Sequence, residues 1–458
     1  MSHDYSFFVT SDEVEILEAN ALISQKLQSG PVVGNKRKVS ALLLSPPSST
    51  GTTSSSSSGS STASVNFSGF RNAQNITNFE LPMSLHSAEA LEWCGFVPGA
   101  AQTIYQRWFN RGEIDIHGEL IDYAIGYIAL LRSSAFQEQW TEDEQMEKVG
   151  INQQIRQAIL DSNFRDVYGT EDLPFWVKDT IRVNYSALED RIRRLKETVV
   201  KLGKKPQNKR PKLRGAFGQE ESSGAASTSS QPTNSATISA ISEAQSEWQQ
   251  FSQGTVLVQE AGSELPGHVT LWKGKSPYEL SANLIRDDGS INHNALLTTG
   301  GGDFNMTQPA WYWTHEKETA ERYRRYAENR SPLVETWLIR IQVPQSFMTE
   351  LGHSDLCYSP NFKEFVWYCR RKTDDLPQKF EQLANSRVVL GHISAANSTK
   401  YLRMKPQNVQ QRFTEDQLMK HGNIKATQWV VTKEPDARLL MANVRGKMHI
   451  EVIAPRDL

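Results

Sequence analysis

Two serine-rich stretches divide this chain of 458 residues and limit what it can fold into. Residues 45–64 include the run SPPSSTGTTSSSSSGSS, and residues 216–246 are again rich in Ser, Thr and Ala. Such segments carry too little apolar surface to offset the conformational entropy that is lost on ordering. We therefore expect them to be linkers, and we expect two folded regions.

Outside these stretches the spacing of apolar residues changes along the chain. Between Leu81 and Leu202, aromatic and aliphatic residues recur three and four apart, which predicts helices. After Thr255, short runs predict strands with single helices between them: TVLVQEA, HVTLW, WYWT, VETWLIRIQV, SRVVLGHI, TQWVV and MHIEVI. The expected fold class is an all-helical N-terminal domain followed by a mixed α+β domain.

The predicted organisation has five parts. The first contains a capping box, because Thr10 is followed three residues later by Glu13 before an apolar periodic run. In chain order the parts are a short helix within 1–30, a disordered Ser-rich linker over 31–78, an all-helical domain over 79–203, a basic and Ser/Thr-rich linker over 204–250, and an α+β domain over 251–458.

Cysteine usage and hydropathy exclude several classes of protein. Cys94, Cys357 and Cys369 are too few and too scattered for a disulfide framework, and none forms a Cys-x-x-Cys zinc motif. Residues 1–11 are polar and acidic, unlike a secretory signal. The longest apolar window, 120–131, is far shorter than the ~20 residues that span a bilayer. We expect an intracellular protein with no membrane partner and no metal.

An apolar stripe ends the helical region. Its members are spaced four and three residues apart over roughly two heptads: Leu188, Ile192, Leu195, Val199 and Leu202. One interpretation is an amphipathic helix packed within its own domain. The other is a contact with a partner, including a homodimer formed through residues 188–202.

Basic residues follow this stripe. Residues 201–215 read KLGKKPQNKRPKLRG. Within 201–214, two clusters of basic residues flank a short polar spacer, and no acidic residue occurs. This pattern is typical of a nuclear localisation signal that an import receptor binds. Contact with nucleic-acid phosphates and a merely solvated linker are the alternatives. Residues 36–38 form a second, weaker basic cluster.

The stretch HVTLWKGKSPYEL contains Gly274, Lys275 and Ser276, the letters that end a phosphate-binding loop. Such a loop needs a glycine five positions before Gly274, because successive backbone amides must wrap the anion. Val269 occupies that position, inside the predicted strand. The sequence therefore excludes this class of nucleotide site.

Three notable segments follow one another along the chain, and the first of them lies in this predicted strand. LWKG is followed by GGGDFNMTQPAWYWTHEKETAERY and then by KEFVWY. In the second segment Thr314 is a plausible N-cap, and Ala320, Tyr323 and Ala327 form the expected buried stripe of a helix. We expect the glycines at 300–302 to form either a mobile loop or a loop that closes over a ligand.

This order resembles the ADP-ribosyltransferase fold, including the poly(ADP-ribose) polymerase catalytic domain and a related bacterial family. The resemblance covers about residues 269–398. LWKG is similar to the family's Leu-Tyr/Trp-His-Gly strand. The middle segment is similar to its Gly-Asp-Phe and Gly-x-Tyr-Phe motifs and its alanine- and tyrosine-containing helix. KEFVWY is similar to its strand Asn-Glu-Tyr-Ile-Val-Tyr.

The resemblance implies NAD as substrate and a set of site residues. The backbone of Gly274 would bind the nicotinamide carboxamide, Tyr312 would stack on the ring, and Tyr323 would belong to the helix that backs the cofactor site. The carboxylate of Glu364 would be catalytic, accepting from the ribose 2′-hydroxyl and stabilising the oxocarbenium-like transition state. Lys273 stands where the family has His or Arg, and can reach a phosphate or ribose oxygen.

Each of these side chains also has a structural interpretation. Tyr312 lies between two tryptophans and could pack in the core, and Lys273 could be solvated or salt-bridged at a strand end. The run around Glu364 alternates like a strand, but a buried helix is equally apolar. On the helical interpretation Glu364 is a surface acid.

The leading hypothesis is a nuclear ADP-ribosyltransferase-like protein that binds NAD, with transfer of ADP-ribose to a macromolecular acceptor as the further step. The alternative is a catalytically inactive module of the same fold, or a nuclear scaffold, that binds a protein or nucleic acid. An active or an inactive site of this fold requires Lys273, Tyr312 and Glu364 to meet in one concave site, whereas their lying on different faces would leave only the scaffold.

Overall fold

A computed structural model of the chain describes most of its residues. The described ranges are 8–20, 22–23, 36–40, 65–71, 78–112, 118–204, 256–258, 262–279, 282–286, 288–298, 301–371, 376–396 and 398–456.

Helices dominate the first half of the chain and alternate with strands in the second half. The α-helices of the first half are α1 (Ser11–Ala19), α2 (Ala88–Cys94), α3 (Pro98–Phe109), α4 (Leu120–Tyr127), α5 (Ser134–Gln139), α6 (Glu142–Lys148), α7 (Gln153–Ile159), α8 (Arg165–Tyr168) and α9 (Leu173–Lys204). Those of the second half are α11 (Lys317–Arg330), α12 (Gln345–Leu351), α13 (Pro360–Arg371), α14 (Glu381–Ala384), α15 (Ser398–Arg403), α16 (Val409–Arg412) and α17 (Glu434–Asn443).

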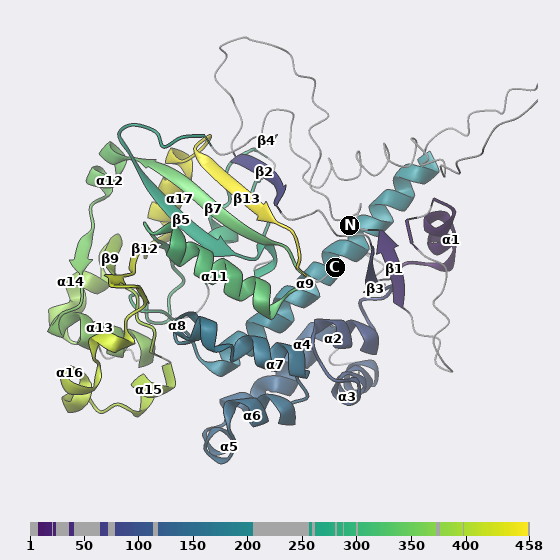
Figure 1. Ribbon diagram of the computed structural model, residues 1–458, viewed down its shortest axis with the longest axis horizontal. Helices are drawn as coiled ribbons and strands as arrows, with labels where there is room; N and C mark the ends of the chain where they lie inside the picture. The colour runs from purple at the N-terminus through teal and green to yellow at the C-terminus, as the bar shows by residue number, and fades with distance from the viewer. Residues whose placement is uncertain are drawn as a thin grey trace, which may run out of the picture.

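A five-stranded sheet lies at the centre of the second half, in the order β4-β2-β13-β7-β5 (Figure 1). Its strands are β2 (Val65–Arg71), β4 (Val256–Val258), β5 (His268–Lys275), β7 (Thr336–Pro344) and β13 (Met448–Ile453). β2 runs parallel to β4 and β13, whereas β7 is antiparallel to both β13 and β5. The sheet thus joins segments from three distant parts of the chain.

A second sheet has four strands in the order β6-β12-β9-β8. Its strands are β6 (Trp311–Trp313), β8 (Ser354–Leu356), β9 (Val388–His392) and β12 (Thr427–Val431). An isolated bridge between Trp272 and Thr314 connects the edge strand β5 to the edge strand β6. Two small pairs complete the sheets: β1 (Lys36–Ser40) with β3 (Asn78–Pro82), and β10 (Lys420–His421) with β11 (Ile424–Lys425).

The five-stranded sheet is covered on both faces, because successive side chains of a strand point in opposite directions. On one face Leu338 packs with Ala320 of α11. On the other face Ile339 and Ile341 pack with α17 and with the tryptophans of β6. β7 is accordingly buried along almost its whole length, including its polar residues Thr336, Arg340 and Gln342.

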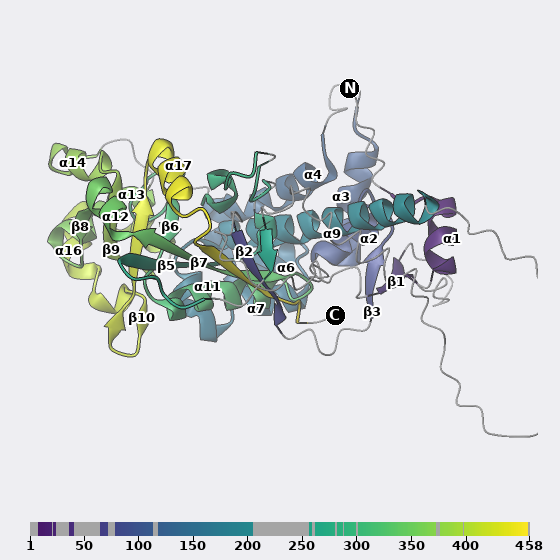
Figure 2. The ribbon, with the colours of Figure 1, turned by 90° about the horizontal axis from the view of Figure 1, so that it is seen from above.

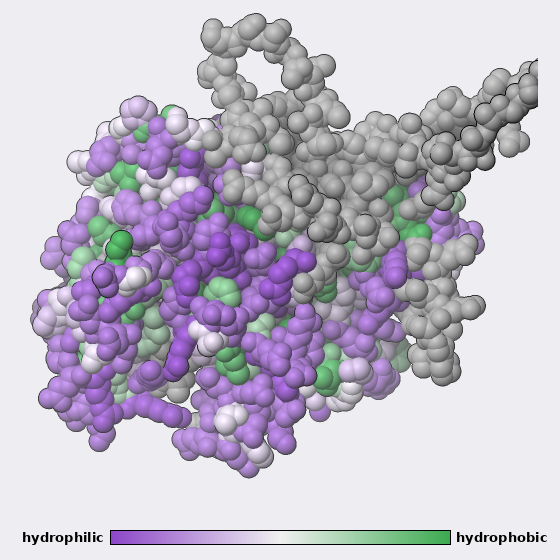
Figure 3. Space-filling model, viewed as in Figure 1, coloured by the Kyte–Doolittle hydropathy of each residue, from purple (hydrophilic) through white to green (hydrophobic). Residues whose placement is uncertain are grey.

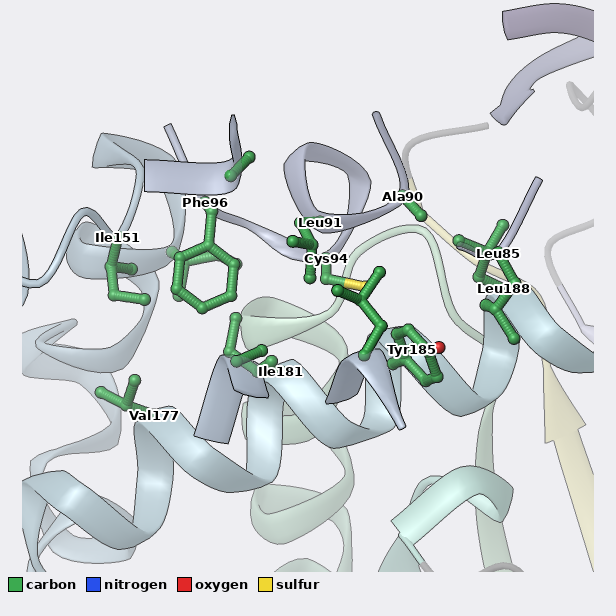
Figure 4. Packing of buried hydrophobic residues seen from close by; sticks show 14 of the residues in the cluster. Leu85, Ala90, Leu91, Cys94, Phe96, Ile151, Val177, Ile181, Tyr185 and Leu188 are labelled. Atoms are coloured by element: carbon green, nitrogen blue, oxygen red, sulfur yellow. The ribbon is translucent and has the colours of Figure 1, made fainter. Parts of the chain in front are cut away.

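The long helix α9 links the helical part to the strands. Figures 1 and 2 show it running from beneath the five-stranded sheet to α1 and the β1–β3 pair. Figure 4 shows Val177, Ile181 and Leu188 of α9 packed against α2 and the loops around it. The same buried cluster includes Tyr326 and Met419 from the C-terminal half, so the two predicted domains share one core.

Several predictions about the elements are confirmed. Each of the seven predicted strands in the C-terminal region contains a strand of the structure, and the region is mixed α+β. Thr10 caps α1 with the predicted capping box to Glu13. Among the described residues no helix is both long and apolar enough to cross a membrane.

Other expectations differ from the structure. β1 and β2 lie inside the predicted linker 31–78, and Val65 and Phe67 of β2 are buried in the core. Leu188, Ile192, Leu195 and Val199 are buried against their own chain and Leu202 is partly buried, so this stripe packs within the molecule, as the first interpretation predicts.

Two further differences are local. Thr314 does not cap α11, which begins at Lys317 after Glu316 as its N-cap. KEFVWY, predicted as a strand by the resemblance, lies in α13, because its apolar side chains form a helical face buried beside α15 and α16.

The basic cluster at 36–38 lies in β1, where Lys36 pairs with Glu92 at 3.2 Å. Of the basic segment 201–214, only 201–204 fall within the described residues.

Candidate functional site

A pocket of about 170 Å³ opens where the edge strands of the two sheets meet α11 and the start of α9. Aromatic side chains form much of its lining: Phe175, Trp176, Trp272, Tyr312, Trp313, Tyr323 and Tyr326. We call it the aromatic pocket. It contains Lys273, Gly274, Tyr312 and Tyr323 among its lining residues, but not Glu364.

Lys273 points from β5 towards the second sheet. Its Nζ donates to the carbonyl of Tyr312 at 3.3 Å and to the hydroxyl of Thr298 at 3.4 Å. Both acceptors are neutral. Burial lowers the pKa of Lys273 to about 7, and repulsion from Lys275 adds to this effect, whereas Glu279 opposes it. The side chain is partly exposed, and the lowered pKa favours the uncharged amine more than in a free lysine.

Gly274 is required by the packing of α11 against β5. A Cβ at this position would overlap the backbone carbonyl of Ala320 and lie 2.8 Å from the amide nitrogen of Arg324. The sequence interpretation assigned this glycine to the approach of a ligand, and the structure supplies a second reason for it.

The backbone of Gly274 nevertheless faces the pocket side of β5. Trp272, two residues earlier, exchanges both of its backbone hydrogen bonds with Thr314, the residue after β6, at 2.7 and 3.0 Å. Hydrogen-bonding direction alternates along a strand, so the amide and carbonyl of Gly274 point the same way, away from β7. An adjacent donor and acceptor are thereby directed at the aromatic pocket.

Tyr312 lies on β6 with its side chain on the face opposite to Trp311 and Trp313. Its hydroxyl donates to Asn305 Oδ1 at 2.7 Å. Burial and the nearby Asp303 raise the pKa of the phenol well above its usual value, so the ring stays neutral. Tyr312 both packs against the core and lines the pocket.

Tyr323 projects from α11, one turn after Ala320. It is partly buried and lines the pocket between the helical segment and the sheets. Burial raises the pKa of its phenol, so this side chain is also neutral.

Glu364 lies outside this pocket, on α13. Its carboxylate pairs with Lys379 and accepts from the amide of Gln410 at 3.0 Å. The side chain is 30% exposed, while its neighbours Phe365, Val366 and Trp367 are buried. The structure therefore brings Lys273, Gly274, Tyr312 and Tyr323 together and leaves Glu364 apart from them.

A polar cluster that the sequence interpretation did not assign forms another part of the pocket. Asp303 accepts at 2.8 Å from Arg370 Nε, from the amide of Ser394 and from Gln428 Nε2. Gln428 also donates to the carbonyl of His392 at 2.9 Å. The Gly-Asp-Phe motif was a signal for Asp303, and the polar residue within the apolar strand TQWVV was a signal for Gln428.

The helical segment supplies the remaining wall. Thr170, Glu171, Phe175, Trp176 and Asp179 line the pocket from the start of α9 and the turn before it. Nothing in the sequence connects this segment with a site about 100 residues later in the chain, because the contact is made only by the tertiary fold.

The four carboxylates that line the pocket are all close to cations. Asp303 lies 2.8 Å from Arg370, Asp179 lies 2.9 Å from Arg330, and Glu279 lies 3.4 Å from Lys275. Glu171 lies 3.9 Å from the same Arg370. Within the described part of the chain, no carboxylate on the pocket wall is left without a positive partner.

Metal binding receives no support from this arrangement. No group of three or more His, Cys, Asp or Glu side chains in the described residues is arranged to hold a metal ion.

Comparisons of the chain with protein-family models, with curated proteins and with solved structures gave no match. The function must therefore be argued from the site.

Proposed function

We propose that the aromatic pocket binds NAD by its nicotinamide end, and that the chain is a binding module of ADP-ribosyltransferase type that does not transfer ADP-ribose. The observation that carries this proposal is the composition of the pocket wall. It combines the strand Trp272–Gly274 with Tyr312 and Gln428, and each of its carboxylates is engaged by a cation.

Nicotinamide suits the shape and polarity of the wall. A carboxamide carries one acceptor and one donor group, which complement the adjacent amide and carbonyl of Gly274. The ring is flat and gains from contact with aromatic faces such as Tyr312. A volume of about 170 Å³ is small beside the ~300–1,000 Å³ of typical cofactor sites, so we expect the pocket to hold the ring while the rest of the dinucleotide lies outside.

Lys273 would lie beside the bound ring. A full positive charge there would oppose a pyridinium cation, and the lowered pKa of the amine reduces that charge near neutral pH. The neutral amine can still hydrogen-bond to a ribose hydroxyl. This supports binding of NAD despite the absence of the family's histidine.

Transfer chemistry is the part that we propose to be missing. β12 reads Thr427-Gln428-Trp429-Val430-Val431, which resembles the order Asn-Glu-Tyr-Ile-Val-Tyr of the family's acid strand, with Gln in place of Glu. An amide cannot supply the negative charge that stabilises an oxocarbenium-like transition state. Gln428 is also held by Asp303 and His392, which fixes its amide in place.

Titration calorimetry of the full chain with NAD tests the binding step. We expect saturable binding that Lys273→Ala weakens by about tenfold. Glu364→Gln is the matched control, and because Glu364 lies outside the pocket it should change the affinity by less than about twofold. Absence of NAD binding to the wild type would refute the proposed ligand.

Incubation with labelled NAD tests the absence of transfer. We expect no release of nicotinamide above the uncatalysed background and no labelled protein. Release that Gln428→Ala abolishes but Glu364→Gln does not would show an active transferase centred on this pocket, and would contradict the binding-module assignment.

A further inference from the structure

A second cavity, of about 400 Å³, lies between the helical segment and α15. We call it the basic pocket. Gln137, Trp140, Gln145, Arg165 and Tyr168 line it from the helical side. Lys400 and Arg403 of α15 line it from the C-terminal half. In Figure 3 the surface around α5, α6 and α15, at the lower left of the view, is mostly hydrophilic.

The charge on the wall of this cavity is strongly unbalanced. Arg165, Lys400 and Arg403 are exposed cations, and Glu142 is the one carboxylate among the lining residues that the structure describes. Three positive charges against one negative charge leave the wall with a formal charge of +2. The carboxylate of Glu142 is already engaged, since it accepts from the hydroxyl of Tyr168 at 2.6 Å.

Among the residues that the structure describes, Arg165, Lys400 and Arg403 form no ion pair with a carboxylate. Lys400 and Arg403 are three residues apart on α15, so they lie on one helix face, where like charges repel. Three cations that line one hollow with no described carboxylate paired to them indicate a site for an anion.

The remaining walls fit a flat, partly polar group. Trp140 and Tyr168 provide aromatic surface, and Gln145 holds the backbone of Trp140 by donating to its carbonyl at 2.7 Å. Lys148 lies 4.7 Å from the centre of the Trp140 ring and adds positive charge at this end. A cavity of this size accommodates a mononucleotide.

We propose that the basic pocket binds a nucleoside monophosphate. Arg165, Lys400 and Arg403 contact the phosphate, with the guanidinium groups donating in pairs to its oxygens. The base lies against Trp140. Aromatic stacking alone would hold a nucleoside weakly, so the phosphate supplies most of the affinity.

This site is separate from the aromatic pocket but adjoins it. Gly169 and Ala395 line the basic pocket, whereas Thr170 and Ile393 line the aromatic pocket. Gly169 and Ala395 form the partition, and a Cβ on Gly169 would overlap the carbonyl of Ala395. The inference stands on its own lining residues and does not depend on NAD binding.

The test is calorimetric titration of the full chain with AMP, adenosine and inorganic phosphate. We expect AMP to bind at least about tenfold more tightly than either fragment. Lys400→Glu and Arg403→Glu should each weaken AMP binding by about tenfold or more. Lys405→Glu is the matched control, because it makes the same charge change two residues beyond Arg403 at an exposed position that does not line the cavity.

The outcomes separate this site from its neighbour. Lys273→Ala should leave AMP affinity unchanged, and loss of AMP binding in that variant would assign the nucleotide to the aromatic pocket instead. Equal affinity for inorganic phosphate and AMP would overturn the nucleoside assignment. Thermal unfolding checks that Lys400→Glu and Arg403→Glu fold. If both folded variants bind AMP as tightly as the wild type, the proposed site is wrong. It is also wrong if the wild type does not bind AMP at millimolar concentration.

Discussion

Lys273 is the residue in which structure and chemistry are most closely coupled. Its ammonium group has lost much of its water and has gained only two neutral acceptors in exchange. The nearby carboxylate of Glu279 is shared with Lys275. A lysine in this environment lowers the stability of the fold when it is charged, which is typical of residues that serve a site rather than the core.

Replacing Lys273 with Met should therefore alter how stability depends on pH. The pKa of Lys273 is about 7 in the folded chain, against a usual value of 10.5. Between these values the unfolded chain binds a proton that the folded chain does not, so wild-type stability gains from Lys273 as pH rises. We expect Lys273→Met to be more stable than the wild type at pH 7, with the difference shrinking towards pH 10.5. Urea unfolding at several pH values measures this, and a constant difference would contradict it.

At the scale of elements, the contact between β5 and α11 positions the site. Ala320 and Gly274 bring a helix backbone directly onto a strand backbone, and this places Tyr323 on the pocket wall. Two neighbouring residues of β5 thus have different roles. Lys273 faces the second sheet, whereas Gly274 allows the backbone of α11 to pack directly against the strand.

Gly274→Ala should separate these two elements. The added methyl would overlap backbone atoms of α11, which cannot turn aside as a side chain can. We expect a loss of about 1–3 kcal/mol in the free energy of unfolding, the usual cost of overpacking a core. Gly262→Ala is the control, because nothing lies within 4 Å of a Cβ at that position. Denaturant titrations of both variants would contradict the interpretation if the two losses were equal.

At the scale of the whole molecule, the helical half and the strand half are not independent. Arg330 of α11 lies 2.9 Å from Asp179, donates to the hydroxyl of Thr180 at 2.7 Å and covers the ring of Trp176. Tyr326 donates to the carbonyl of Ile159 at 2.9 Å. The aromatic pocket has walls from both halves, so a fragment of either half would lack a complete site.

Arg330→Met should weaken both halves together. Removing one partner of a buried ion pair leaves Asp179 without its cation, which costs about 3 kcal/mol or more. We expect the midpoint temperature of unfolding to fall by the same amount whether it is measured by helical circular dichroism or by tryptophan fluorescence. Arg325→Met, on the exposed side of the same helix, should change stability by less than about 0.5 kcal/mol. Separate transitions for the two signals would show that the halves unfold independently.

Much of the fold could be predicted from local patterns. The apolar alternation of β7 and β13 and the helical spacing of α9 each identified an element, because periodicity reports which side chains share a face. β2 was missed although Val65 and Phe67 alternate, since a short run between serine-rich flanks resembles a linker until another strand pairs with it. The run around Glu364 was misassigned because a short apolar segment fits a strand and a buried helix equally well.

By itself the sequence predicted the helical region and seven strands after Thr255, that β5 contains no phosphate loop, and that Lys273, Gly274 and Tyr312 are candidates for one site. Only the tertiary structure decided that Gln428 rather than Glu364 lines this pocket, that the start of α9 supplies one of its walls, and that Lys400 and Arg403 of α15 line the same cavity as Arg165. The physical reason is that periodicity is a property of neighbours along the chain. A pocket is made by residues more than 100 positions apart, and their meeting depends on how whole elements pack.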